Sequence, residues 1–172
     1  MRQFSTVSLR ALTALAILFV SFTACQPDDD DNPVTCQPSG YVNQAATGEF
    51  MDTAYTVLTG KAKEDPFDST KYRFTLYGET PTGDMCDNFN FDLPRKSIIF
   101  ILPKTTGAYP LSSTRGVTFN YALPNQTDAT VATCGNLEIT SITATTITGK
   151  IEADAKDNQS FLNGNFTVEL CQ

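Results

Sequence analysis

Residues 134–170, CGNLEITSITATTITGKIEADAKDNQSFLNGNFTVEL, decide the fold class of this chain. Three segments within this stretch, Leu137–Ile142, Thr146–Asp154 and Asn165–Leu170, alternate apolar and polar side chains at every second residue. That period is typical of β-strands with one buried face, and short connections favour antiparallel neighbours. The C-terminal third is therefore predicted to form a three-stranded meander.

The same type of pattern extends upstream. Alternation recurs in Glu49–Glu64, Tyr72–Glu79 and Val117–Leu123. Ser97–Leu102, SIIFIL, is instead continuously apolar and ends at Pro103, which predicts a central strand covered on both faces. Glycine and proline punctuate the connections, and no helical period follows residue 23. We expect an all-β fold: an antiparallel β-sandwich or flattened β-barrel of about seven or eight strands, mostly a meander.

The N-terminal segment is predicted to be a lipoprotein signal peptide covering residues 1–24. Arginines flank its polar start, an apolar run occupies Leu12–Phe22, and small Ala24 precedes Cys25. The run is about half of the ~20 residues that a membrane-spanning helix requires. Cys25 is therefore the predicted lipidation site, and the membrane the predicted partner of its acyl chains.

Residues 25–46 are predicted to be a lipidated acidic tether, followed by one β domain over residues 47–172. Asp28–Asp31 repel one another, and the flanking prolines disfavour a helix. An acidic cluster directly after the lipidated cysteine resembles the signal that sends Bacteroidetes lipoproteins to the outer face of the outer membrane. We therefore expect an outer-membrane, cell-surface location.

The charge of the chain argues against nucleic acid as a partner. Twelve basic and 19 acidic residues give a net charge of −7. Removal of residues 1–24 takes away two arginines and leaves 10 − 19 = −9. Polyanions and anionic lipid surfaces are repelled by such a charge.

Four cysteines follow Cys25, an even number that favours two disulfides in an exported chain. In the meander, Cys134 and Cys171 lie at opposite ends of the sheet, too far apart to bond. Continuing the meander backward places Cys86 beside Cys134. The expected disulfides are Cys86–Cys134 and Cys36–Cys171. A zinc site is the alternative, but the sequence has neither a CxxC pair nor a histidine to support it.

The sequence gives little support for a catalytic site. The chain has no histidine, the commonest general base, and most strand carboxylates alternate with apolar residues and so point to solvent. We expect neither an enzyme nor a cofactor. A weak metal candidate is the stretch with Asp84, Asp87, Asn90 and Asp92, whose oxygens suit calcium but lack EF-hand spacing; a disulfide-pinned loop or edge strand is favoured there.

Two short surface motifs, Asp52-Thr53-Ala54 and Asp68-Ser69-Thr70, resemble the general O-glycosylation signal of Bacteroidetes. They make Thr53 and Ser69 candidate acceptors.

The C-terminal third also resembles a group of Bacteroidetes putative lipoproteins of unknown function. Their pattern has a glycine before an I-T strand, a T-I-x-G strand and a final N-G-x-F strand, with an earlier G-x-Y-x-L segment. Lys150 and Glu152 depart from it, because an aromatic-rich strand is expected there. The resemblance implies a β-rich envelope domain with no activity attached. The matching residues are Gly107, Tyr109, Leu111, Gly135, Ile139, Thr140, Thr146, Ile147, Gly149, Asn163, Gly164 and Phe166.

These patterns predict a lipid-anchored cell-envelope protein that acts as a binding or interaction module with a protein or glycan partner. One alternative is a calycin-like carrier of a small apolar ligand, which needs an empty cavity inside a barrel. Another is an accessory glycan-binding lipoprotein. Its possible aromatic contacts are Tyr72, Tyr77, Tyr109 and Tyr121, although core packing also explains Tyr72 and Tyr121.

Overall fold

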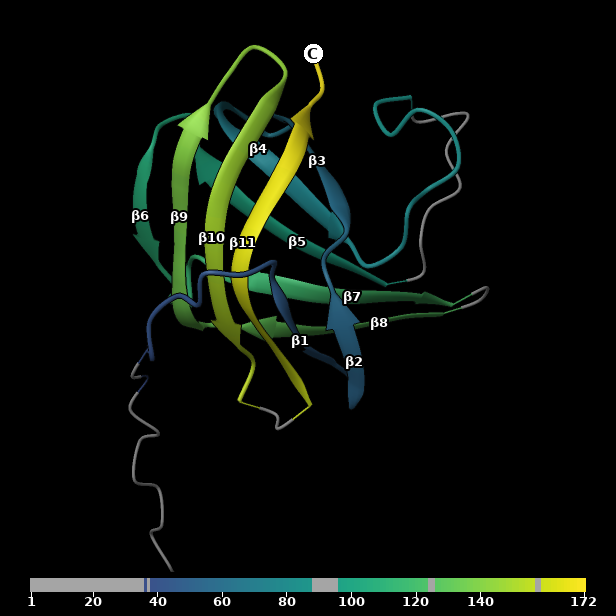
Figure 1. The fold of residues 1–172 in the computed structure, drawn as a ribbon, viewed down its shortest axis with the longest axis vertical. Helices are drawn as coiled ribbons and strands as arrows, with labels where there is room; N and C mark the ends of the chain where they lie inside the picture. Colours follow the sequence, from purple (N-terminus) through teal and green to yellow (C-terminus); the bar gives the residue numbers. More distant parts are fainter. Residues whose placement is uncertain (1–35, 37, 88–95, 124–125, 157–158) are drawn as a thin grey trace, which may run out of the picture. The chain divides into compact units, whose positions relative to one another are not determined.

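The computed structural model describes residues 36, 38–87, 96–123, 126–156 and 159–172, which form one compact unit. Every regular element in these residues is a β-strand, which confirms the all-β class (Figure 1). Eleven strands are present, more than the predicted seven or eight. They are β1 (Thr47–Phe50), β2 (Thr53–Thr56), β3 (Thr59–Asp65), β4 (Asp68–Tyr77), β5 (Lys96–Pro103), β6 (Gly107–Pro110), β7 (Val117–Leu123), β8 (Gln126–Ala132), β9 (Cys134–Ile142), β10 (Thr146–Asp154) and β11 (Ser160–Leu170).

One cause of the higher strand count is a tight turn inside the predicted strand Glu49–Glu64. Met51 and Asp52 have φ values of 50° and 58°, and Phe50 pairs with Thr53. Two central residues with positive φ form the turn that suits a two-residue hairpin. The usual signal for that turn is Asn-Gly or Asp-Gly, so Met-Asp gave no warning of it.

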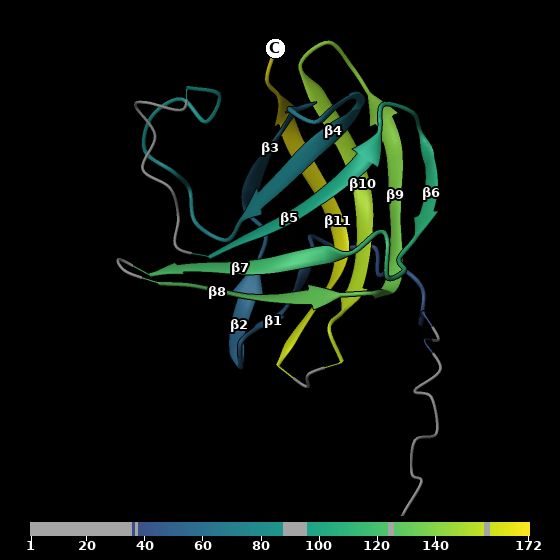
Figure 2. The same cartoon turned by 180° about the vertical axis from the view of Figure 1, so that it is seen from behind.

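All eleven strands belong to a single sheet, which curls so that its two halves face each other (Figures 1 and 2). The main order is β6-β9-β10-β11-β3-β4-β5-β7-β8, with β1 pairing with β11 and β2. The predicted meander β9-β10-β11 is confirmed. The meander ends at β11, because the next strand in the main order, β3, runs parallel to β11.

Aromatic rings from the facing halves fill the interior of the curled sheet. Phe74 of β4 stacks on Phe100 of β5 with 4.8 Å between ring centroids. The Phe166 ring of β11 meets these two rings at 6.1 and 5.7 Å. Burial of each such side chain contributes roughly 1.5–3 kcal/mol.

The predicted coverage of Ser97–Leu102 on both faces was wrong. Ile98, Phe100 and Leu102 are buried in the core, but Ile99 and Ile101 are half-exposed on the outer face. These two side chains line a shallow groove of about 220 Å³. A single curled sheet has only one inner face, so the alternate residues of β5 point outward.

Two disulfides join Cys36 to Cys134 and Cys86 to Cys171, each with Cα atoms 5.3 Å apart. The expected pairing Cys86–Cys134 and Cys36–Cys171 was therefore wrong. The expected separation of Cys134 from Cys171 does hold, because Cys134, the first residue of β9, pairs with Asp154 at the end of β10, whereas Cys171 follows β11 beside the start of β10. The error came from extending the meander backward from β9, whose other neighbour in the sheet is β6 and not the preceding strand β8.

The parallel pairing of β11 with β3 explains the correct disulfides. It brings Ala62 beside the end of β11, where the Cys171 N–H donates to the Ala62 carbonyl at 2.8 Å. The loop after β4 then reaches Cys171 rather than Cys134. Cys134 bonds instead to Cys36, which lies before the first strand.

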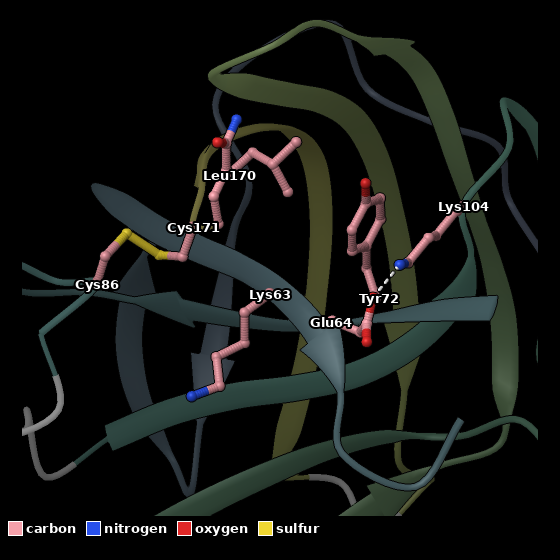
Figure 3. A pocket seen from close by; sticks show the side chains of 8 residues that line it. Lys63, Glu64, Tyr72, Cys86, Lys104, Leu170 and Cys171 are labelled. Carbon is pink, nitrogen blue, oxygen red and sulfur yellow. Dashed lines mark hydrogen bonds and ion pairs between the residues drawn. A yellow bond between two sulfur atoms is a disulfide. The ribbon is translucent and has the colours of Figure 1, made fainter. Parts of the chain in front are cut away.

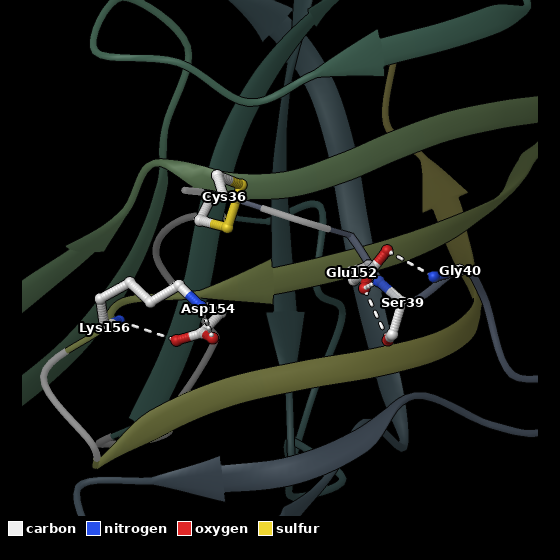
Figure 4. Close-up of a disulfide and its surroundings, with 7 residues drawn as sticks. Cys36, Ser39, Gly40, Glu152, Asp154 and Lys156 are labelled. Atoms are coloured by element: carbon white, nitrogen blue, oxygen red, sulfur yellow. Dashed lines mark hydrogen bonds and ion pairs between the residues drawn. A yellow bond between two sulfur atoms is a disulfide. The ribbon is translucent and has the colours of Figure 1, made fainter. Parts of the chain in front are cut away.

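Residues 38–46 form an arm that lies along β10 and β11, although they were predicted to be part of the tether. The Glu152 carboxylate accepts hydrogen bonds from Ser39 and Gly40 close to the Cys36–Cys134 disulfide (Figure 4). Asn163 donates to the Gly40 carbonyl at 3.0 Å. The compact unit accordingly begins at Cys36.

Candidate ligand-binding cleft

A cleft lies where β11 ends and β3 continues. The two strands pair only at Glu169 with Lys61 and Leu170 with Ala62, whereas β3 runs on to Asp65. The space beside the last residues of β3 is therefore left to side chains. It holds a volume of about 550 Å³, within the range of small-molecule sites. Its lining residues are Lys63, Glu64, Tyr72, Cys86, Lys104, Leu170, Cys171 and Gln172 (Figure 3).

One wall of the cleft carries an ion pair stacked on an aromatic ring. The Lys104 ammonium lies 2.5 Å from the Glu64 carboxylate and 5.0 Å from the centroid of the Tyr72 ring. The side chains of Lys104 and Glu64 are 29% and 60% exposed. A cation over a ring face is attractive, and the exposed pair still meets water. This wall therefore offers a donor, an acceptor and a ring at fixed positions.

The opposite wall of the cleft is apolar. It consists of the Leu170 side chain and the Cys86–Cys171 disulfide. In Figure 3 the Tyr72 ring stands between this wall and Lys104. Phe74 holds the ring from the core side, in an edge-on contact with 6.4 Å between centroids.

Local hydrogen bonds fix the Cys86 segment over β3. The Lys61 ammonium donates to the Met85 carbonyl at 2.7 Å, and the Cys86 N–H donates to the Asp84 carboxylate at 2.8 Å. Lys61 is only 8% exposed. Burial, the largest cause, lowers the pKa of Lys61; the Lys63 ammonium lowers it further, and Asp84 opposes both.

The hairpin that supplies Glu64 and Tyr72 ends in a rigid turn. The Asp65 side chain is 3% exposed and pairs with the Arg73 guanidinium at 3.2 Å. The same carboxylate accepts from the Phe67 N–H at 2.9 Å. Phe67 itself is 89% exposed at the tip.

The predicted metal candidates are only partly described. Asn90 and Asp92 lie outside the described residues, while the Asp87 N–H donates to the Asp84 carbonyl in a turn. Ligand atoms of Asp84, Cys86 and Glu169 lie within 4.8 Å of one another. The Cys86 sulfur is already bonded to another sulfur and is no thiolate ligand. Two exposed carboxylates remain, which by themselves define no metal site.

The four tyrosines named as possible sugar contacts are dispersed. Tyr72 lines the cleft, but Tyr77 is 1% exposed in the core, where burial raises its pKa to about 12. Tyr109 is half-buried beneath the Arg115 guanidinium, and Tyr121 packs against the core. Of these four, Tyr72 is the tyrosine at the cleft.

The remaining predicted sites are modification sites. Thr53 on β2 and Ser69 on β4 are both exposed, so an enzyme could reach either hydroxyl. The Thr53 hydroxyl donates to the Met51 carbonyl at 3.3 Å. Cys25 lies outside the described residues.

Sequence reasoning missed Glu64, Lys104 and Leu170 as site residues. They come from three distant segments that only the parallel β11-β3 pairing and the β4-β5 pairing bring together. A short shared edge of two residue pairs leaves no pattern in the sequence.

Comparison with known proteins adds no relative: no family model, curated protein or solved structure matches this chain. Within the described residues, no helix is long and apolar enough to span a membrane.

Proposed function

We propose that this chain is a lipoprotein anchored through Cys25 to the outer membrane and displayed on the cell surface, where it binds a ligand in the cleft between β3 and the end of β11. The observation that carries the proposal is the position of the two disulfides at opposite ends of the β9-β10-β11 sheet. The Cys36–Cys134 disulfide joins β9 to the segment that follows Cys25 in the sequence. The other forms a wall of the cleft.

The strand register supports this separation. Cys134 pairs with Asp154, which in turn pairs with Phe161 near the start of β11. Cys171 follows Leu170 at the other end of that strand, which has 11 residues. At about 3.3 Å per residue, the ten steps from Phe161 to Cys171 separate the two ends by about 33 Å along the strand. Cys36, the first residue of the β domain, is therefore bonded at the end of these strands that is remote from the cleft.

The length of the tether fits surface display. The chain from Cys25 to Cys36 spans at most about 40 Å when extended. Its four adjacent aspartates are a sequence signal for a solvated tether. A cleft held this far from the bilayer is accessible to soluble ligands and to neighbouring proteins.

A binding module is better supported than an apolar carrier. In a carrier the ligand sits between the faces of the curled sheet. That space here holds the packed rings of Phe74, Phe100 and Phe166. An open cleft outside the core is instead suited to a partner that remains partly in solvent.

The proposal includes membership of the Bacteroidetes lipoprotein group that the C-terminal pattern resembles. The two departures from that pattern have a structural use in this chain. Glu152 binds the arm at Ser39, and Lys150 lies 5.3 Å from the ring centroid of Tyr41. An aromatic-rich strand at those positions would lose these contacts with the arm.

Fatty-acid labelling tests the anchor. An alkyne fatty acid fed to cells is expected to label the protein in the outer-membrane fraction, and Cys25→Ser is expected to abolish the label. Cys171→Ser is the control, because it removes a different sulfur. Label that persists in Cys25→Ser contradicts the anchor.

A membrane-impermeant biotin reagent that reacts with amines tests display. Lys71 and Lys156, with side chains 44% and 42% exposed, are expected to react on intact cells. A periplasmic protein serves as the control for leakage. Biotinylation seen only after the outer membrane is broken contradicts surface display.

A further inference from the structure

We infer that the ligand of the cleft is a neutral saccharide, held with one face of a sugar ring against Tyr72 and with hydroxyls at its rim directed toward Glu64 and Lys104. This inference rests on the proposed function, because it names the ligand class of the same cleft.

The walls match the two kinds of surface on a sugar. A pyranose presents C–H groups on its faces and hydroxyl groups around its rim. The Tyr72 ring and the Leu170 side chain give apolar surface for the faces. Glu64 and Lys104 give a carboxylate acceptor and an ammonium donor for adjacent hydroxyls. Hydrogen bonds to charged groups are about twice as strong as neutral ones, which suits a ligand with many hydroxyls.

The balance of charge favours a neutral ligand. Glu64 and Lys104 carry opposite charges 2.5 Å apart, so their fields largely cancel at the Tyr72 ring. In Figure 3 the amine of Lys63 points away from that ring. The carboxylate of an acidic sugar would have to displace Glu64 from Lys104 to gain a partner. A hydroxyl at the outer edge of the pair avoids that loss, since it can donate to Glu64 or accept from Lys104 while the two stay in contact.

The ring is available and held in place. Lys104 covers one side of Tyr72, and the side toward Leu170 faces the cleft (Figure 3). Contact with Phe74 restricts the ring before the ligand arrives. A preorganised ring loses little conformational entropy on binding.

A protein ligand is less well supported by the surface. The large apolar side chains that are most exposed belong to five different segments rather than to the cleft. They are Val42, Leu58, Phe67, Val131 and Phe161.

The test uses the full chain, purified in detergent, on an array of neutral oligosaccharides and their acidic counterparts, followed by calorimetry with the best neutral binder. We expect neutral oligosaccharides to bind. Tyr72→Ala is expected to weaken binding about tenfold or more, whereas Tyr72→Phe keeps most of the affinity. Glu64→Ala is expected to weaken binding as well, and its exposed position keeps the fold intact.

Tyr109→Ala is the matched control. Tyr109 is also half-buried with a cation on its ring, the Arg115 guanidinium at 5.7 Å, but it does not line the cleft. Its loss is expected to change affinity less than twofold. The inference is overturned if no neutral oligosaccharide binds, if acidic ones bind instead, or if Tyr72→Ala and Glu64→Ala bind like the wild type.

The two proposals fail separately. A chain that is lipidated and displayed but binds no neutral saccharide overturns only the ligand class. A chain that binds neutral oligosaccharides but carries no acyl chain on Cys25 overturns the anchor and leaves the ligand class standing.

Discussion

The carboxylate of Glu152 accepts hydrogen bonds from both the backbone N–H and the hydroxyl of Ser39, a residue 113 positions earlier in the chain. A third bond comes from the Gly40 N–H at 3.2 Å. These contacts tie the N-terminal arm to β10. They give Glu152 a role in the fold.

Glu152→Ala is expected to release the arm without unfolding the sheet. The loss of three charge-assisted hydrogen bonds at an exposed site should cost about 1–3 kcal/mol. Hydrogen exchange followed by NMR should show faster exchange at the amides of Ser39 and Gly40. Glu64→Ala on β3, an exposed change outside the arm, is the control, and unchanged exchange at Ser39 in Glu152→Ala would contradict the role of this carboxylate.

Peptide mapping without reduction is expected to recover Cys36 linked to Cys134 and Cys86 linked to Cys171. These disulfides close loops with sequence separations of 98 and 85 residues. Replacing either cysteine pair with alanine should lower the free energy of unfolding by about 2–4 kcal/mol. A peptide that links Cys86 to Cys134 would refute the observed topology of β3 and β11.

Gly149→Ala is expected to destabilise the domain by about 2 kcal/mol or more. A Cβ atom at this position would lie 2.3 Å from the Glu138 carbonyl oxygen and 2.4 Å from the Phe166 ring. Urea unfolding measures the loss. Ser141→Ala, an exposed change on β9, should have little effect, and equal stability of the two variants would argue against the close approach of Phe166.

Two phenylalanines test where the core lies. Phe100→Ala should cost about 3–5 kcal/mol, since Phe100 is 2% exposed and stacked on Phe74. Phe67→Ala should change stability by less than about 0.5 kcal/mol, because Phe67 is 89% exposed. Thermal unfolding of both variants decides the prediction, which fails if the two melt alike.

The carboxyl group of Asp68 is expected to titrate well below the ordinary range. Hydrogen bonds from the Thr70 hydroxyl, the Lys71 ammonium and the Thr70 N–H lower its pKa to about 2. Because the folded pKa is depressed, the resulting stabilisation is complete above the ordinary pKa of 3.8 and is lost as the pH falls toward 2.

Thr70→Val removes the largest of these causes and should raise the pKa of Asp68. Carboxyl chemical shifts recorded by NMR between pH 1.5 and 6 measure both forms. A midpoint near 3.8 in the wild-type protein would refute the prediction.

Most strands that sequence reasoning identified have a regular alternation of apolar and polar residues, and β5 was identified from its continuous apolar run. The segment from Thr146 to Asp154 has such an alternation, and its buried residues fall at every second position. β8 escaped prediction because polar and small residues dominate Gln126–Ala132. Strand identity is thus encoded locally, by which side chains are apolar.

The cleft could not be found in the same way. Alternation states which face of a strand is buried but says nothing about its neighbour. Glu64 and Tyr72 face each other across the β3-β4 hairpin, but Leu170 meets them only through the pairing of β11 with β3, which depends on how the whole sheet curls. Tyr72 was identified as a possible contact by residue type alone, whereas its partners needed the topology.

The Cys36–Cys134 disulfide also determines how the domain responds to mechanical force. If Cys25 is held in a membrane while a ligand pulls on the cleft, tension enters β9 covalently at Cys134 and bypasses the hydrogen bonds of the arm. The pull is then directed along β9, whose pairs with β6 and β10 resist together in shear rather than opening one by one. Reduction of this one bond would shift the load onto Ser39 and Glu152, so that the arm would peel away first.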